Sequence, residues 1–339
     1  MSKSKRGAAF RVRNRQPRAQ SQRSGPKPRA QSPKPVVGLI GLGIMGSAMA
    51  ANTVRAGYTV IGYDVDAVRV RDHVRAGGIA ARNSADVRKR SDIVICSLPS
   101  AVALAQVAAE LAESDGADVV VETSTMPIAV KVAAQQRLGE AGVTLLDCPL
   151  SGTGSQAKVR DIVVYASGVE SAYRRVMPVM DAFARAHYHV GPFGAGSKMK
   201  FVANLLVAIH NVAAAEGLVL AMKAGLDPAL TLKVIGDGGG SSRMLQVRGP
   251  MMVSGDYSSP TMKLDVWQKD MNAIAEFAKE VGCPTPLFAT TAPIYLAAMA
   301  AGRGAEDTGA VCAVLEEMAS FNRPSPSPRR KGNLRLDRL

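Results

Sequence analysis

Short apolar runs alternate with longer amphipathic stretches through the first half of the chain. The runs are rich in Val, Ile and Leu and end at Gly, Pro, Ser or Asp, a pattern that is typical of buried strands. They predict strands at residues 36–40, 58–63, 92–98, 118–122, 143–147, 162–166 and 188–190. Helical stretches separate most of these runs, one of them at 171–185. Strands that alternate with helices predict an α/β fold built on a doubly wound parallel sheet.

The second half of the chain shows a helical pattern only. After glycines at 191, 194 and 196, the chain runs to Gly225 without a proline and consists mostly of Ala, Leu, Val and Met. This predicts one long helix, and because it is apolar nearly all round we expect it to be buried on most of its faces. Further helices are expected at 228–236, 243–253, 262–281, 287–301 and 307–320.

The net charge of +14 lies in the two ends of the chain. Residues 1–34 hold eleven Lys or Arg and no acidic residue, residues 323–339 add a further +5, and residues 35–322 carry −2. Both ends are rich in Pro, Ser and Arg, so we expect disordered basic segments. The first also has some features of an organelle presequence, although its apolar face is thin. The four cysteines form no CxxC pair, which fits free thiols in a reducing, cytoplasmic setting.

A glycine motif joins the first predicted strand to a helix. It consists of Gly41, Leu42, Gly43, Ile44, Met45 and Gly46, and Asp64 follows the second strand. A GxGxxG turn in this context, with an acidic residue about 20 positions later, predicts a dinucleotide site. Asp64 would bind a ribose hydroxyl and repel a 2′-phosphate, which favours NAD. Arg69 and Arg71 could instead reach a phosphate, so NADP stays open.

Two polar residues stand out in the long helix. Lys200 and Asn204 are four residues apart and therefore share one face. Burial and the positive end of the helix dipole should push Lys200 toward its neutral form. Such a lysine is suited to donate or accept a proton. No aspartate, histidine and cysteine cluster indicates a metal site, and no apolar run reaches the length of a membrane span without polar or small breaks.

Polar residues also follow other predicted strands. Leu98 and Pro99 end one strand, and Ser124 and Thr125 end the next, at the sheet edge where ligands of such folds bind. Ser100 could equally cap a helix. The loop from Asp147 contains Ser151, Gly152 and Thr153 and could turn backbone N–H groups toward an anion.

Taken in order, these pieces resemble the β-hydroxyacid dehydrogenases over residues 36–320. The resemblance comprises GLGxMG at 41–46, a substrate loop at 147–153, the GxGxxxKxxxN helix at 194–204 and the pair Lys269-Asp270. It implies a Rossmann-type domain at 35–195 and an all-helical substrate and dimerisation domain at 196–322.

The resemblance also implies a role for each motif. Lys200 would be the general acid and base, and Asn204 would hold the substrate beside it. Ser124, Ser151, Gly152 and Thr153 would bind the substrate. Leu98, Pro99, Thr125 and Lys269 would border the cofactor. Thr153 departs from the usual glycine and could narrow the pocket.

The implied activity is NAD(P)-dependent hydride transfer to or from a short β-hydroxyacid or semialdehyde. 3-Hydroxyisobutyrate, tartronate semialdehyde, threonate, and succinic semialdehyde or glyoxylate remain open as substrates. A homodimer or homotetramer is expected. Two rivals remain. One is an imine reductase, although relatives of that type usually lack the lysine. The other is an inactive homologue that binds nucleic acid through its basic ends. We expect any such binding to be non-specific at most.

Overall fold

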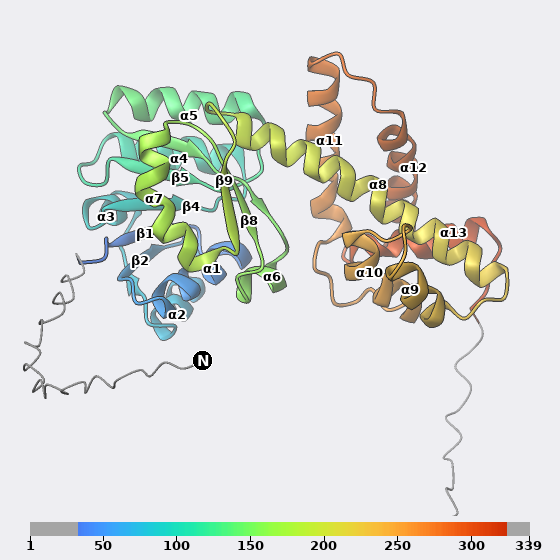
Figure 1. Ribbon diagram of the computed structural model, residues 1–339. Helices are drawn as coiled ribbons and strands as arrows, with labels where there is room; N and C mark the ends of the chain where they lie inside the picture. Colours follow the sequence, from blue (N-terminus) through green and yellow to red (C-terminus); the bar gives the residue numbers. More distant parts are fainter. Residues whose placement is uncertain (1–32, 324–339) are drawn as a thin grey trace, which may run out of the picture. The chain divides into compact units, whose positions relative to one another are not determined.

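A six-stranded sheet forms the first part of the chain in the computed structural model, which describes residues 33–323 (Figure 1). Its strands all pair in parallel, in the order β3-β2-β1-β4-β5-β6. They are β1 (Val37–Ile40), β2 (Val60–Tyr63), β3 (Ile79–Ala80), β4 (Ile93–Cys96), β5 (Val119–Glu122) and β6 (Thr144–Asp147). The doubly wound parallel sheet is confirmed. The two basic ends of the chain lie outside the described residues.

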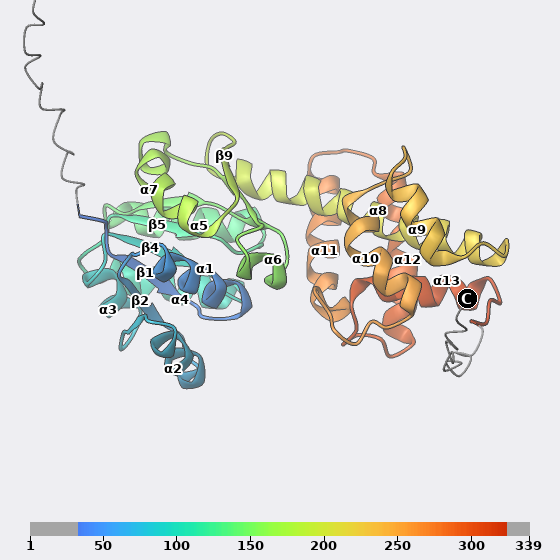
Figure 2. The same ribbon diagram turned by 60° about the horizontal axis from the view of Figure 1, so that its bottom comes forward.

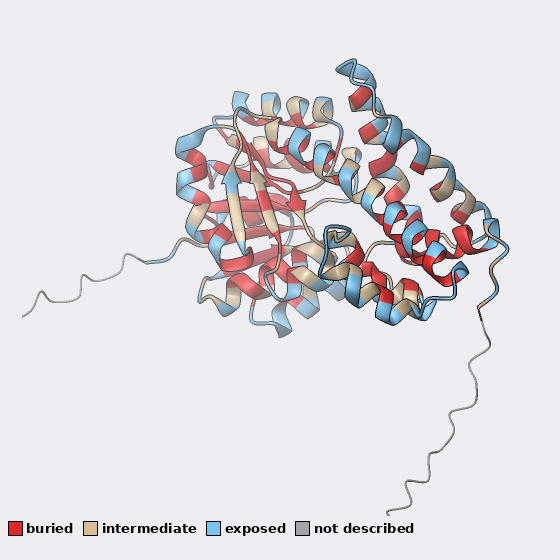
Figure 3. Cartoon of the chain, turned by 45° about the vertical axis from the view of Figure 1, so that its right-hand side comes forward, coloured by how far each residue is buried: buried red, intermediate tan, exposed pale blue. Residues whose placement is uncertain are grey.

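Helices cover both faces of this sheet because successive side chains of each strand point to opposite faces. In β4, Ile93 and Ile95 join the core beneath helices α1 and α7, whereas Val94 and Cys96 join the core beneath α4 and α5. The central strands β1, β4 and β5 are buried at every position, whereas both residues of the edge strand β3 are exposed (Figure 3). The helices are α1 (Ile44–Arg55), α2 (Ala67–Arg75), α3 (Ser84–Lys89), α4 (Ala101–Ala112), α5 (Ile128–Glu140), α6 (Gly154–Lys158) and α7 (Glu170–Phe183).

A second, three-stranded sheet follows in the order β7-β8-β9. Its strands are β7 (Leu150–Ser151), β8 (Val163–Ala166) and β9 (Ala186–His189). The sequence predicted β8 and β9 to within two residues, but it missed β7 and also β3. Each of these has only two residues, too few for a period-two pattern to be recognised.

Helix α8 (Ala195–Lys223) runs from the sheets into an all-helical region (Figure 2). It packs against the helices that follow it, which form a second core around Phe201, Leu218 and Trp267. These helices are α9 (Pro228–Gly236), α10 (Arg243–Ser254), α11 (Leu264–Glu280), α12 (Pro286–Ala300) and α13 (Val311–Met318), with a 3-10 turn at Thr308–Ala310. The all-helical second part is thus confirmed.

The expectation that α8 is buried on most of its faces is confirmed, because its exposed residues follow one face of the helix. Val202, Leu206 and Leu220 are 45–72% exposed, and half of the most apolar 18-residue window of α8 is buried. By length and composition alone, this one helix among the described residues is able to cross a membrane, contrary to our expectation that no run qualifies. Its central position in the helical core gives an alternative reason for its apolar character.

Candidate active site

The turn after β1 has glycines at the points where a side chain would clash. A Cβ on Gly41, whose φ is +90°, would lie 2.1 Å from the Ser97 carbonyl oxygen, and one on Gly46 would lie 1.8 Å from that of Gly41. A Cβ on Gly43 would meet no protein atom closer than 3.8 Å. The backbone is therefore open on the side of Gly43, at the amino terminus of α1, where Ile44 is 73% exposed. These features fit a dinucleotide pyrophosphate at the helix terminus.

Asp64 is held beside this turn. Its carboxylate accepts hydrogen bonds from the backbone N–H of Leu42 at 2.7 Å and of Asp66 at 2.9 Å. Arg69 lies 3.4 Å from both Asp64 and Asp66, so this arginine is already paired with two carboxylates. The position of Asp64 at the end of β2 fits a ribose hydroxyl, as the motif predicts.

Lys200 and Asn204 are both buried on one face of α8. Burial lowers the pKa of Lys200, an effect that Asp270 opposes and Lys269 reinforces. The Asn204 amide donates a 3.0 Å hydrogen bond to Asp270 on α11. Burial in turn raises the pKa of Asp270, against the attraction of Lys200 and Lys269. We did not predict a site role for Asp270, although its pairing with Lys269 in the sequence was the signal.

Glycines let α8 begin close to the rest of the site. Gly194, with φ +90°, precedes the first helical residue. A Cβ on Gly196 would lie 2.3 Å from the Tyr165 carbonyl oxygen and 2.6 Å from that of Asp147. The first turn of α8 therefore packs directly on the substrate loop and on β8. This contact fixes the position of Lys200, which follows one helical turn later.

Two cavities meet at Lys200. The larger, about 340 Å³, is also lined by residues that we expected at the cofactor and at the substrate, namely Ile44, Met45, Leu98, Ser124, Thr125, Gly152, Thr153 and Lys269. The smaller, about 180 Å³, is lined by Ser151, Gly152, Thr153, Lys200 and Asn204 together with residues of α10. Lys200, Gly152 and Thr153 line both cavities, so the lysine stands where the two adjoin.

The strand ends contribute fixed polar atoms to the larger cavity. The Ser124 hydroxyl accepts from the Leu98 N–H at 2.8 Å, and Lys269 of α11 donates to the Thr125 carbonyl oxygen at 3.1 Å. Pro99 is exposed and is not among the residues that line this cavity. Ser100 caps α4 through a 3.2 Å bond from the Ala103 N–H, which settles the alternative left open for this residue.

The substrate loop is shaped by one glycine and one cap. Gly152 has φ +136°, and a Cβ there would lie 2.7 Å from Ile162, so only glycine fits without strain. The Thr153 hydroxyl forms a capping box with Gln156 at the start of α6. This hydroxyl is thus engaged in the helix cap, while Thr153 also lines both cavities, where we expected it to narrow the pocket.

Known proteins resemble the chain over both of its parts. Residues 36–191 match a family described as the NAD binding domain of 6-phosphogluconate dehydrogenase. Residues 194–315 match a second family, described as "NAD-binding of NADP-dependent 3-hydroxyisobutyrate dehydrogenase". L-threonate dehydrogenase of Cupriavidus necator is 32% identical over 82% of this chain and 95% of its own. The chain belongs to the β-hydroxyacid dehydrogenase family.

Two further relatives support this membership. 2-(Hydroxymethyl)glutarate dehydrogenase of Eubacterium barkeri is 31% identical over 84% of this chain and 96% of its own. The crystal structure of 3-hydroxyisobutyrate dehydrogenase from Salmonella typhimurium superposes with a TM-score of 0.73 at 31% identity, over 82% of this chain and 99% of that one. This β-hydroxyacid dehydrogenase is accordingly an NAD(P)-dependent oxidoreductase.

A buried ion cluster lies beneath the site of this dehydrogenase and was not predicted from the sequence. Lys131 of α5 is completely buried and lies 2.7 Å from both Glu122 and Asp147, which end β5 and β6. Burial pushes the pKa of Lys131 down, but the two carboxylates more than compensate, so its pKa is raised. Lys131 also donates to the Ser124 carbonyl oxygen at 2.6 Å. Helical spacing alone gave no signal, since an isolated lysine in an amphipathic helix predicts a solvated side chain.

Asp147 connects this cluster to α8. Its carboxylate accepts from the backbone N–H of Ser197 at 2.8 Å and from the Ser197 hydroxyl at 2.9 Å. Asp147 begins the substrate loop, and in the dehydrogenase it also binds the first turn of the helix that carries Lys200. One carboxylate thereby links β6, Lys131 and α8.

Proposed function

We propose that this dehydrogenase transfers a hydride between NAD and the β-carbon of a short β-hydroxyacid or the corresponding semialdehyde, with Lys200 as general acid and base. The observation that carries the proposal is the position of Lys200, a buried lysine of lowered pKa at the junction of the two cavities. A proton-transfer group belongs where cofactor and substrate meet.

The residues divide the work in the oxidation direction. The hydroxyl proton passes to neutral Lys200 as the hydride leaves the adjacent carbon. The nicotinamide supplies the hydride chemistry by accepting that electron pair. The Asn204 amide donates one N–H to Asp270, which leaves its second N–H to donate to the oxygen of the substrate hydroxyl. Ser151 and the N–H of Gly152 bind the substrate carboxylate, with Ser124 at the border of the larger cavity.

The cofactor side is assigned to the turn and the neighbouring strand ends. Gly41 to Gly46 hold the pyrophosphate, and Asp64 binds the adenine ribose. NAD is favoured over NADP because Asp64 carries a negative charge at the ribose position and Arg69 is paired with Asp64 and Asp66. Leu98, Thr125 and Lys269 border the nicotinamide half, whereas Pro99 does not line the larger cavity and is assigned no contact.

A substrate panel tests the proposal. The full-length enzyme is assayed by NADH and NADPH absorbance with 3-hydroxyisobutyrate, threonate, tartronate semialdehyde and 2-(hydroxymethyl)glutarate. These are compounds that relatives of this chain act on according to their names. We expect turnover with at least one compound and a higher kcat/KM with the NAD pair. Asp64→Ala should reduce that preference, whereas a matched Asp66→Ala should change it less. Absence of turnover on every compound would contradict the proposal.

The remaining proposals concern the setting of the enzyme. We place it in the cytoplasm and expect a homodimer or homotetramer. We assign no membrane or nucleic-acid partner to it beyond non-specific contact through the basic ends.

A further inference from the structure

The smaller cavity carries more positive charge than a single substrate carboxylate requires. Besides Lys200, its lining includes three arginines, Arg185, Arg243 and Arg248, and one acidic residue, Asp161. Arg248 is neutralised by the buried carboxylate of Asp307 at 2.9 Å. Arg185 and Arg243 have only Asp161 to share between them, so this part of the cavity keeps an excess of about one positive charge.

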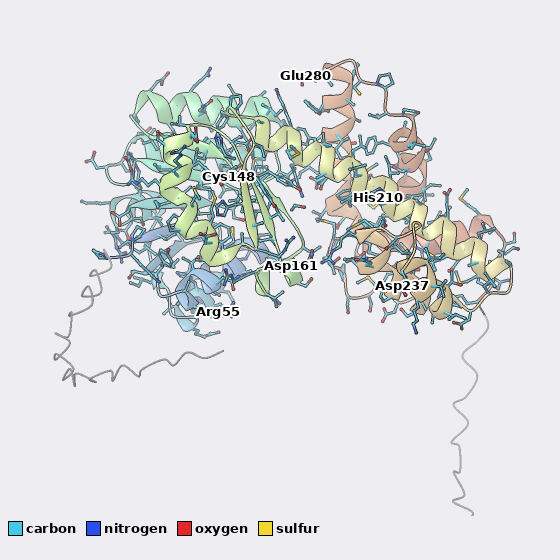
Figure 4. The ribbon with its side chains drawn as sticks, viewed as in Figure 1. Arg55, Cys148, Asp161, His210, Asp237 and Glu280 are labelled. Atoms are coloured by element: carbon cyan, nitrogen blue, oxygen red, sulfur yellow. The ribbon has the colours of Figure 1, made fainter. Side chains whose placement is uncertain are left out.

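The two arginines approach Asp161 from different parts of the chain. Arg185 precedes β9 and donates from Nε to one carboxylate oxygen at 2.9 Å, while Arg243 of α10 donates from Nη2 to the other at 3.1 Å. Asp161 lies in the loop between α6 and β8 (Figure 4). Within residues 33–323, neither guanidinium has another hydrogen-bond acceptor. Each therefore keeps N–H donors for a further anion.

The position of Arg243 strengthens this excess. It is the first residue of α10, a 12-residue helix whose amino terminus is capped by Ser242. Helix amino termini favour anions and disfavour cations. A negative group that bound Arg243 would gain from both the guanidinium and the helix terminus.

We propose that Arg243 and Arg185 bind a second carboxylate of the substrate, so that the enzyme acts on β-hydroxyacids that carry a carboxylate at each end. The first carboxylate lies at Ser151 and Gly152, the hydroxyl at Lys200 and Asn204, and the second carboxylate at the two arginines. A cavity of about 180 Å³ suits a small acid of this kind, since it is well below the size of drug-binding pockets. This inference rests on the proposed function and specifies its substrate class.

A matched pair of substrates tests the inference. One is a β-hydroxyacid with a two-carbon arm that ends in a carboxylate, and the other has the same arm ending in a methyl group. We expect the wild-type enzyme to prefer the dicarboxylate in kcat/KM. Arg243→Met should raise KM for the dicarboxylate about tenfold or more and leave KM for the methyl analogue within about twofold, because a charge-assisted hydrogen bond is lost with one substrate only.

Two further variants separate this role from a purely structural one. Asp161→Asn frees both guanidinium groups, and we expect it to lower KM for the dicarboxylate. Arg137→Met, which removes an exposed arginine paired with Glu113 on the surface, serves as the control and should change neither substrate. If Arg243 only bridged Asp161, its loss would affect both substrates equally.

These experiments distinguish failure of the dicarboxylate site from failure of the proposed dehydrogenase function. If Arg243→Met retains turnover but changes KM equally for both substrates, the dicarboxylate site is overturned and the dehydrogenase mechanism stands. Absence of turnover on both substrates and on the wider panel, in an enzyme that still binds NADH, overturns the proposed function itself.

Discussion

At the scale of single residues, the proposed chemistry depends on one lysine whose pKa is lowered by its surroundings. Burial of Lys200 costs the ammonium its hydration, and Asp270 restores only part of that loss. A lysine that loses its proton nearer to neutral pH can serve both directions of a hydride transfer, as the acid when protonated and as the base when neutral.

The pH dependence of turnover should follow this lysine. Oxidation of the hydroxyacid requires neutral Lys200, so kcat/KM for oxidation should rise with pH through the pKa of Lys200. Reduction requires the ammonium, and its kcat/KM should fall over the same range. Because the pKa of Lys200 is lowered, both midpoints should lie below that of an ordinary lysine. Rate profiles in both directions, measured at saturating cofactor, provide the check.

Asp270 provides the control for that profile. Its carboxylate opposes the lowering of the Lys200 pKa, so Asp270→Asn should move both midpoints to lower pH. A profile that is flat in the wild type, or a shift to higher pH in Asp270→Asn, would contradict this account of the lysine.

At the scale of elements, the first turn of α8 is fixed to the ends of β5 and β6 through a cluster without solvent contact. Glu122, Lys131 and Asp147 are each fully buried, and Asp147 binds Ser197. Such clusters add little net stability when complete, but the loss of one member leaves uncompensated charges in the interior.

Replacement of Lys131 by methionine should therefore be costly. We expect Lys131→Met to lower the free energy of unfolding by about 3–5 kcal/mol, because two buried carboxylates lose their cation. Urea unfolding of the variant and the wild type measures the difference. Lys233→Met, at an exposed lysine of α9, should change stability by less than about 0.5 kcal/mol. A Lys131→Met enzyme as stable as the wild type would show that the cluster does not hold α8.

The elements also show what sequence could and could not provide. Buried strands such as β4 and helices with clear ends such as α9 were predicted correctly. In these segments the spacing of apolar residues agrees with the residues that mark the ends of the element. The strands β3 and β7 were missed because two residues carry no period. Lys200 and Gly43 could be proposed from the sequence because the signals for them lie in local motifs. Lys131 was missed because its partners come from two other elements, which only the fold brings together.

At the scale of the whole molecule, α8 and α13 leave apolar surface uncovered. Leu220 and Met318 are 72% and 67% exposed, and an open groove of about 700 Å³ runs between their helices. Contiguous apolar surface of this kind is typical of interfaces. We expect a second copy of the chain to cover it.

Light scattering tests this expectation. The wild type should give two or four times the chain mass of 35.5 kDa. The double variant Leu220→Glu, Met318→Glu should dissociate, because it places charges in the proposed interface. Val74→Glu, at a half-exposed apolar position on α2, should keep the wild-type mass. A wild-type mass of one chain at micromolar concentration would exclude the dimer.

The most direct test of the central claim is turnover of Lys200→Ala together with its affinity for NADH. Hydride transfer should fall by at least about a hundredfold, the usual contribution of a positioned acid or base, while NADH binding measured by fluorescence should stay within a few-fold of the wild type. Retention of turnover in Lys200→Ala would contradict the assignment of this lysine, whatever substrate the enzyme uses.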